Sequence, residues 1–150
     1  MRPKLSIAPL AAERVLQAYP LIREAAPDVT VEGWRRFALA AIGGPRTRLA
    51  ASGAMVVRTE NDYLRGVFTY HVGPDMHRGR ILVVDSIVVS SLFMPEAVAD
   101  AILEAIDALA KTHDCRTIQT DLLSRTAWLQ AHFEEHGYGR IGNRLGRQIA

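Results

Sequence analysis

Residues 81–103 read ILVVDSIVVSSLFMPEAVADAIL, and their pattern changes from strand to helix near the middle. Residues 81–90 are too continuously apolar for a sheet with one face in water, which predicts a central strand covered on both sides. Pro95 suits the first turn of a helix. Beyond it, one face of the helix carries the apolar side chains Val98, Ile102, Ile106 and Leu109. The stretch therefore predicts a buried strand that leads through a short turn into an amphipathic helix.

The residues before this stretch predict two helices and an antiparallel hairpin. A short strand is expected at residues 4–7, and a helical pattern follows over residues 11–25, where Pro20 kinks or splits it. Thr30 can cap a second helix that ends at Gly43. The predicted apolar face of that helix consists of Trp34, Phe37, Leu39 and Ile42. The hairpin strands, at residues 55–59 and 63–72, are rich in β-branched and aromatic residues and flank the Asn61-Asp62 turn.

The residues after residue 103 predict a strand at 117–122, a helix from Ser124 to His136 that Gly137 stops, and a last strand over 138–149. The predicted order is therefore β-α-α-β-β-β-α-β-α-β. This order indicates an α+β fold in which helices flank a mostly antiparallel central sheet.

The composition favours one domain spanning residues 1–150, because 150 residues of which 49% are hydrophobic can build one substantial core but not two. The formal charge is only +2 and the two signs are interleaved, so neither a nucleic-acid surface nor a membrane surface is expected. Cys115 is the single cysteine, which excludes an internal disulfide. No signal peptide or membrane span is recognisable, so we expect a cytoplasmic protein.

The order of elements, together with the strand–turn–helix over residues 81–103, resembles the GNAT superfamily of N-acetyltransferases. In that family the central strand leads into a turn of the type R-x-x-G-x-G/A. The backbone N–H groups of the turn and the following helix N-terminus hold the CoA pyrophosphate. Here Met94 stands in place of the arginine and Ala97 in place of a glycine, whereas Ala99 is an accepted variant. The acyl-CoA loop is therefore degenerate.

The resemblance implies acetyl-CoA as co-substrate, with its thioester positioned by the backbone of Ile87, Val88 and Val89. It also implies that Met94 belongs to the CoA-binding loop and that the backbone amides of Ala97, Val98 and Ala99 point at a phosphate of CoA. Any side chain at residue 97 narrows the space through which the phosphate approaches these amides. Glu96 also places a carboxylate where the anion would sit, so weakened CoA binding is expected.

The last helix of GNAT enzymes carries an asparagine, an alanine and a tyrosine, and the tyrosine often protonates the departing thiolate. By resemblance, Thr126, Leu129 and Phe133 occupy those positions here. Thr126 keeps a hydroxyl for a CoA contact, whereas Phe133 cannot donate a proton. The usual general acid is therefore absent, and Leu129 and Phe133 are expected in the core.

Asp85 is the candidate general base that would take a proton from the ammonium of the acceptor amine. It interrupts an apolar strand, where a charge is costly unless it is paired or faces a cleft. The alternative is that Asp85 is an ordinary ion-pair partner of Arg65 or Arg80. The sequence leaves both interpretations open.

Residues 132–136 read HFEEH and match H-x-x-E-H, the zinc-binding pattern of inverted metalloproteases. A catalytic zinc needs a third protein ligand, and no Asp, Glu, His or Cys follows His136. We therefore predict no metal site. Residues His71, Asp75 and His77 could line a cleft or hold a metal, but solvated loop positions are favoured for them.

Two functions from different classes follow. The first is an acyl-CoA-dependent N-acetyltransferase that moves an acetyl group to a small-molecule or peptide amine by direct attack. The second is a catalytically inactive GNAT-fold module that binds a small molecule or a protein partner. Homodimerisation is left open in both.

Overall fold

The computed structural model describes residues 4–122 and 127–149. One five-stranded sheet with the order β1-β2-β3-β4-β5 forms its centre. The three ladders that join β1 to β4 are antiparallel, and the fourth, between β4 and β5, is parallel. The strands are β1 (Leu5–Pro9), β2 (Ala51–Thr59), β3 (Leu64–Asp75), β4 (Gly79–Val89) and β5 (Thr117–Thr120). The predicted α+β class, with a mostly antiparallel sheet, is confirmed.

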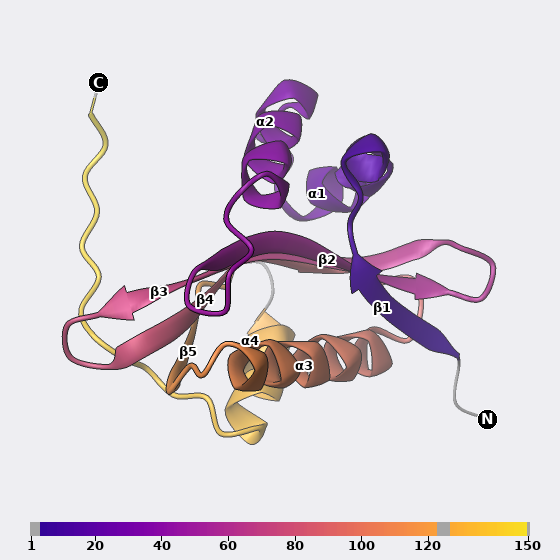
Figure 1. The fold of residues 1–150 in the computed structure, drawn as a ribbon. Helices are drawn as coiled ribbons and strands as arrows, with labels where there is room; N and C mark the ends of the chain where they lie inside the picture. Colours follow the sequence, from indigo (N-terminus) through magenta and orange to yellow (C-terminus); the bar gives the residue numbers. More distant parts are fainter. Residues whose placement is uncertain (1–3, 123–126, 150) are drawn as a thin grey trace.

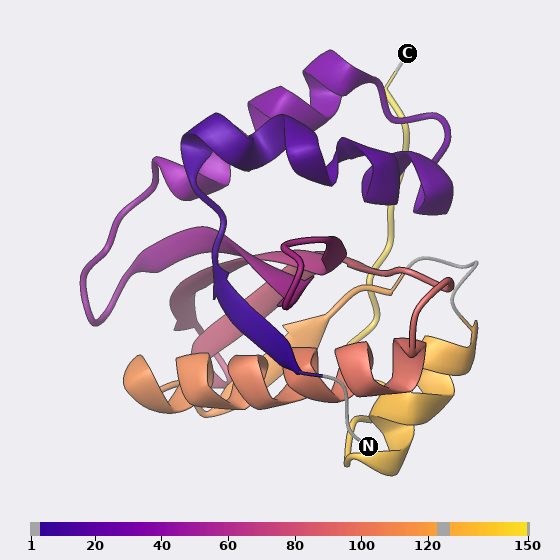
Figure 2. The same cartoon turned by 90° about the vertical axis from the view of Figure 1, so that its right-hand side faces the viewer.

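Helices cover both faces of the sheet (Figures 1 and 2). The first layer contains the 3₁₀ helix η1 (Ala12–Ala18), α1 (Tyr19–Ala25) and α2 (Val31–Ile42). The second layer contains α3 (Pro95–Thr112) and α4 (Ala127–Glu135). The predicted split at Pro20 is confirmed, because the chain changes there from a 3₁₀ helix to an α-helix.

The sheet separates two hydrophobic clusters. Phe68, Leu82 and Ile87 pack on the α3 side with Ile102 and Phe133. The cluster on the α1 and α2 side includes Val67 and Val88 of the sheet together with Trp34 and Ala38 of α2. Since β4 contributes buried side chains to both clusters, the prediction of a central strand covered on two sides is confirmed.

Local chemistry accounts for most element boundaries. The side chain of Thr30 accepts a hydrogen bond from the Gly33 amide at 3.0 Å, which confirms the predicted cap of α2. The turn between β2 and β3 contains Asp62 at φ 65°, a left-handed conformation that aspartate tolerates better than most residues. Phe37 was expected on the apolar face of α2 but is 45% exposed, because Trp34 and Ala38 occupy the side that meets the sheet.

The predicted last strand over residues 138–149 is wrong. Residues 139–149 have no regular structure and extend from the side of α4 to the level of α1 and α2 (Figures 1 and 2). Glycines at 139, 142 and 146 raise the entropic cost of ordering this segment, and Gly142 has φ 68°, which no β-strand uses. Within the described part of the chain, β5 therefore ends the sheet as an edge strand.

Candidate active site

The strands β4 and β5 separate after Val84 and Thr120, and this point is called the fork. Their parallel ladder contains four registered pairs and ends where Val84 faces Thr120. Asp85 is the next residue of β4. Beyond it, β4 continues to Val89 with β3 as its partner, while no further pair to β5 is formed among the described residues. A fork between parallel strands exposes backbone groups that a ladder would otherwise use.

A bulge in β4 accompanies the fork. Opposite Phe68 of β3, β4 carries one extra residue, since Thr69 faces Asp85 and Val67 faces Val88. Ser86 has φ 52°, which is unusual for a residue other than glycine. A bulge bends its strand and redirects neighbouring groups, so the backbone turns away from β5 directly after Asp85.

Ile87, Val88 and Val89 follow the bulge. Ile87 and Val88 are buried, with their side chains in the clusters on opposite faces of the sheet. Val89 is partly buried against the α3 side. These side chains are committed to packing, so this segment offers a ligand mainly its backbone.

Asp85 lies on the sheet face that α1 and α2 partly cover, and its side chain is 34% exposed. Its carboxylate is 3.6 Å from Nδ1 of His71. The ion-pair interpretation with Arg65 or Arg80 is wrong, because Arg80 donates instead to the His113 carbonyl at 3.1 Å and Arg65 lies over aromatic rings. His71 is a partner that the sequence does not predict, because only the register of β3 on β4 places the two residues diagonally across one ladder.

The first turn of α3 begins at the end of the β4–α3 connection. Met94 is the N-cap with φ 38°, its side chain makes no cap hydrogen bond, and it is 48% exposed. The Val98 amide donates to the Met94 carbonyl at 3.2 Å, so it is occupied by the helix itself. Pro95 has no N–H, which leaves the amides of Glu96 and Ala97 in this turn for an external acceptor.

This geometry corrects the expected set of phosphate-facing amides. Val98 and Ala99 are buried in the α3 core, and their positions in the helix direct their amides into the helical ladder. Ala97 is half-buried and keeps its place in the expected set, whereas Glu96 is exposed beside it. The anion-binding capacity of this turn therefore rests on two amides and the helix dipole.

The resemblance assigned three residues of the predicted last helix to the family's CoA-contacting positions, and the structure describes two of them. Thr126 lies outside the described residues. Leu129 and Phe133 are buried, as expected, and the Phe133 ring packs 5.0 Å from the Tyr138 ring. The hydroxyl of Tyr138 is buried and has no hydrogen-bond partner among the described residues. Burial, with a smaller effect of Asp107, raises the pKa of Tyr138 to about 12, so this phenol is a weaker acid than an ordinary tyrosine.

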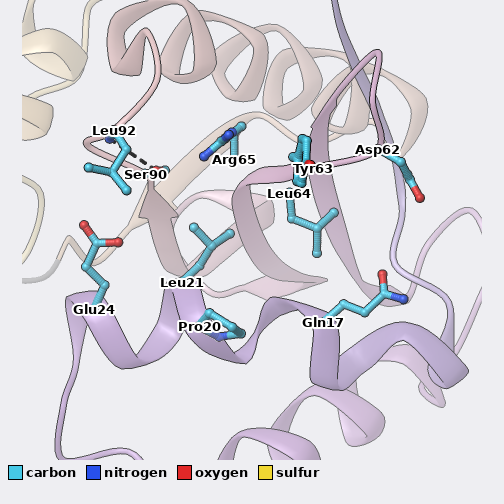
Figure 3. Close-up of a pocket in the computed structure, with 10 residues that line it drawn as sticks. All are labelled: Gln17, Pro20, Leu21, Glu24, Asp62, Tyr63, Leu64, Arg65, Ser90 and Leu92. Atoms are coloured by element: carbon cyan, nitrogen blue, oxygen red, sulfur yellow. Dashed lines mark hydrogen bonds between the residues drawn. The ribbon is translucent and has the colours of Figure 1, made fainter.

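A cavity of about 340 Å³ lies between α1 and the ends of β3 and β4 (Figure 3). Glu24 of α1 lines it and accepts a hydrogen bond from the Ser91 hydroxyl at 3.0 Å. Arg65 lines the opposite part, with its guanidinium 5.6 Å from the Tyr63 ring centroid and 5.2 Å from that of Phe93. The cavity is therefore lined by two carboxylates, Glu24 and Asp62, and by the cation of Arg65, near the end of the sheet where α3 begins. Asp62 is paired with Arg14 and Arg58. Asp85 is not among its lining residues.

The loop histidines do not gather with Asp75. Its carboxylate accepts hydrogen bonds from the backbone amides of His77 and Arg78 at 3.0 and 2.8 Å, and these bonds lower the pKa of Asp75. His71 faces Asp85 instead. Asp75 therefore closes the turn between β3 and β4. The predicted loop positions are wrong for His71 and Asp75, because β3 extends to Asp75, and only His77 lies in the turn.

No protein-family model matches this sequence, and no curated protein matches it. Solved structures do match it over nearly the whole chain. A ribosomal-protein-alanine N-acetyltransferase from Brucella melitensis biovar Abortus 2308 aligns with a TM-score of 0.77 at 16% identity, covering 98% of this chain and 100% of that chain. A transcriptional regulator from Bacillus halodurans C-125 gives 0.78 at 11% identity, with coverages of 97% and 100%.

An aminoglycoside N-acetyltransferase, solved in complex with CoA, gives a TM-score of 0.79 at 11% identity and covers 99% of this chain and 97% of its own. The fold that these structures share with the present chain is the GNAT acyltransferase fold. The predicted fold is confirmed on this ground. Among the described residues, no helix is long and apolar enough to cross a membrane.

Proposed function

We propose that this protein is an acyl-CoA-dependent N-acetyltransferase acting on a small-molecule or peptide amine. The observation that carries the proposal is the fork after Val84 and Thr120, because it joins three features at one end of the sheet. These are unpaired strand backbone, a carboxylate at Asp85 and, through the connection after β4, the free amides at the start of α3. The fold of the solved acetyltransferases supports the same assignment.

The backbone suits acetyl-CoA better than the side chains do. The strand segment of Ile87, Val88 and Val89 lacks a β5 partner, and the Glu96 and Ala97 amides lack helical acceptors within their turn. Such amides at a helix N-terminus bind phosphate groups. The exposed Glu96 carboxylate opposes an anion there, so the affinity for CoA is expected to be lower than a glycine-rich turn would provide.

The bound acetyl-CoA supplies a thioester. Asp85 takes a proton from the ammonium of the acceptor, which frees the nitrogen lone pair to attack the acetyl carbonyl carbon. The new C–N bond forms as the C–S bond breaks, and the electron pair leaves on the CoA sulfur. The nitrogen loses its second proton as the amide forms, and in this proposal that proton reaches the thiolate through water, since Phe133 has no proton to give and burial raises the pKa of Tyr138.

The cavity in Figure 3 is the candidate acceptor site. Glu24 offers a negative charge to an ammonium group, and Arg65 offers a positive charge to an anionic substituent of the same molecule. Asp85 lies outside the cavity lining, so an acceptor must extend from the cavity to the fork. A zwitterionic or peptide amine meets these requirements.

The alternative function is a GNAT-fold module that binds a small molecule or protein without catalysis. It is favoured by the loss of the usual general acid at Phe133, which is buried against Tyr138. Glu96 beside the free amides favours it further. Fold alone does not choose between an enzyme and a binding module.

Isothermal titration calorimetry with acetyl-CoA and with free CoA tests the proposal. Micromolar binding of both, followed by release of free thiol in the presence of a panel of amines, is the expected result. An absence of binding would overturn the enzymatic function and leave the binding module. The free Cys115 supports a cytoplasmic location for this reaction, because free thiols are typical of reducing compartments.

A further inference from the structure

Three potential metal ligands meet where α3 and α4 lie against each other. Asp100 projects from α3, and His132 lies on α4. His136 directly follows the last residue of α4, four residues after His132. One ligand atom from each of the three lies within 4.8 Å of the others. Nε2 of His132 is 2.7 Å from Oδ1 of Asp100, and Nε2 of His136 is 4.0 Å from the same oxygen.

These separations suit a small divalent ion after a modest side-chain adjustment. Ligand atoms about 2.1 Å from a tetrahedral zinc ion lie about 3.4 Å from one another. The present distances bracket that value. Two imidazoles with one carboxylate favour zinc or a related transition metal over Ca²⁺ or Mg²⁺, which prefer oxygen ligands.

The orientation of His136 is already fixed. Its Nδ1 lies 2.8 Å from the backbone carbonyl of His132, and a carbonyl can only accept, so Nδ1 carries the proton. The lone pair is then left on Nε2, the atom that faces Asp100. A hydrogen bond from the outer imidazole nitrogen to a carbonyl is a common support of metal-binding histidines.

We propose that Asp100, His132 and His136 form a binding site for one zinc-type divalent ion that ties α3 to α4. The H-x-x-E-H pattern has no third ligand downstream. Asp100, which lies 32 residues upstream of His132, supplies it. Asp100 is 58% exposed and His136 is 47% exposed, so water completes the coordination. The site stands on the outer side of α3, whereas Val98 and Ala99 of the same helix face the sheet.

The ion stabilises the position of a short helix. The structure describes α4 over nine residues, with Leu129 and Phe133 as its buried side chains. A helix of this length depends on tertiary contacts, because nucleation is unfavourable and few hydrogen bonds follow. A metal ligated from both helices adds a contact that the unfolded chain lacks, and ligands of the native state raise its stability.

The test uses the full chain without a histidine tag. Titration calorimetry with zinc chloride should give one ion per chain, and zinc should raise the melting temperature by several degrees in a manner that EDTA reverses. Asp100→Asn, His132→Ala and His136→Ala should each weaken binding about tenfold or more, since even the loss of an outer partner of a metal ligand has that effect.

His77→Ala is the matched control, because it removes an exposed imidazole from a loop elsewhere and should leave zinc binding unchanged. Asp100→Asn guards against misfolding, since it preserves the shape of an exposed side chain. Zinc affinity that is the same in all four variants would overturn the proposal. A stoichiometry of half an ion per chain would also overturn it, because the ion would then bridge two copies.

Discussion

Val84 of β4 and Thr120 of β5 are the last paired residues of their parallel ladder, and Asp85 follows Val84 directly. The bulge at Ser86 then turns β4 away from β5. The only carboxylate in the apolar strand therefore lies where the two strands separate. Its side chain is partly exposed and contacts His71 rather than an arginine.

Replacing Asp85 by asparagine should lower kcat/KM for an amine acceptor by about 10²- to 10⁴-fold, the usual contribution of general acid–base catalysis. The measurement is release of the CoA thiol under initial-rate conditions. Acetyl-CoA affinity by calorimetry should remain unchanged, because the side chain does not bind CoA in the proposed site. Asp28→Asn, an exposed carboxylate in a loop, is the control. Equal turnover of the Asp85 variant and the wild type would remove Asp85 from the mechanism.

Glu96→Gln should tighten CoA binding by about two- to fivefold, because it removes a negative charge next to free amides at a helix N-terminus. Calorimetry at low ionic strength measures the change. Glu104→Gln provides the control, since Glu104 is an exposed residue of the same helix but lies beyond its first turns. If both variants bind CoA like the wild type, the anion does not sit at the start of α3.

Gly66→Ala should destabilise the protein by about 1–3 kcal/mol, the usual cost of overpacking a core. A Cβ atom on Gly66 would lie 2.8 Å from Cγ1 of Val98 and 3.2 Å from Cδ1 of Ile102, so α3 would have to move away from β3. Urea unfolding gives the free energy. Gly73→Ala is the control in the same strand, because a Cβ there meets no atom within 4 Å. Similar midpoints for the two variants would contradict the close packing of β3 on α3.

Tyr138 should make the protein sensitive to alkali. Burial raises its pKa in the folded state to about 12, from 10.0 in the unfolded chain. Above pH 10 the unfolded chain loses this proton first and binds fewer protons than the folded one, so stability falls as pH rises toward 12. Tyr138→Phe removes the group, and its stability should fall less steeply between pH 10 and 12.

Denaturant unfolding at pH 8 and at several values above pH 10 measures this difference. Tyr63→Phe is the control, because Tyr63 is 61% exposed. The expectation is contradicted if wild type and Tyr138→Phe lose stability in parallel. At pH 8 the Tyr138 variant should be at least as stable as the wild type, since it no longer buries a hydroxyl that has no partner among the described residues.

The sequence alone determined the elements whose causes are local. The apolar run of β4 and the helical spacing after Pro95 predicted a central strand and α3 because each pattern has its own periodicity. Thr30 and Pro20 marked helix boundaries for similarly local reasons, through a side-chain cap and a missing N–H. The order of these elements, together with the strand–turn–helix over residues 81–103, carried the resemblance that predicted the GNAT fold.

The tertiary structure decided what depends on contacts between distant residues. The last strand does not form, because its glycines disfavour order and no pairing with β5 compensates for that cost. The partner of Asp85 and the fork beside it depend on the register of three strands. Asp100 meets His132 and His136 only because α3 packs against α4. Periodicity records which face of an element is apolar, whereas the residues that meet across two elements are set by how those faces pack.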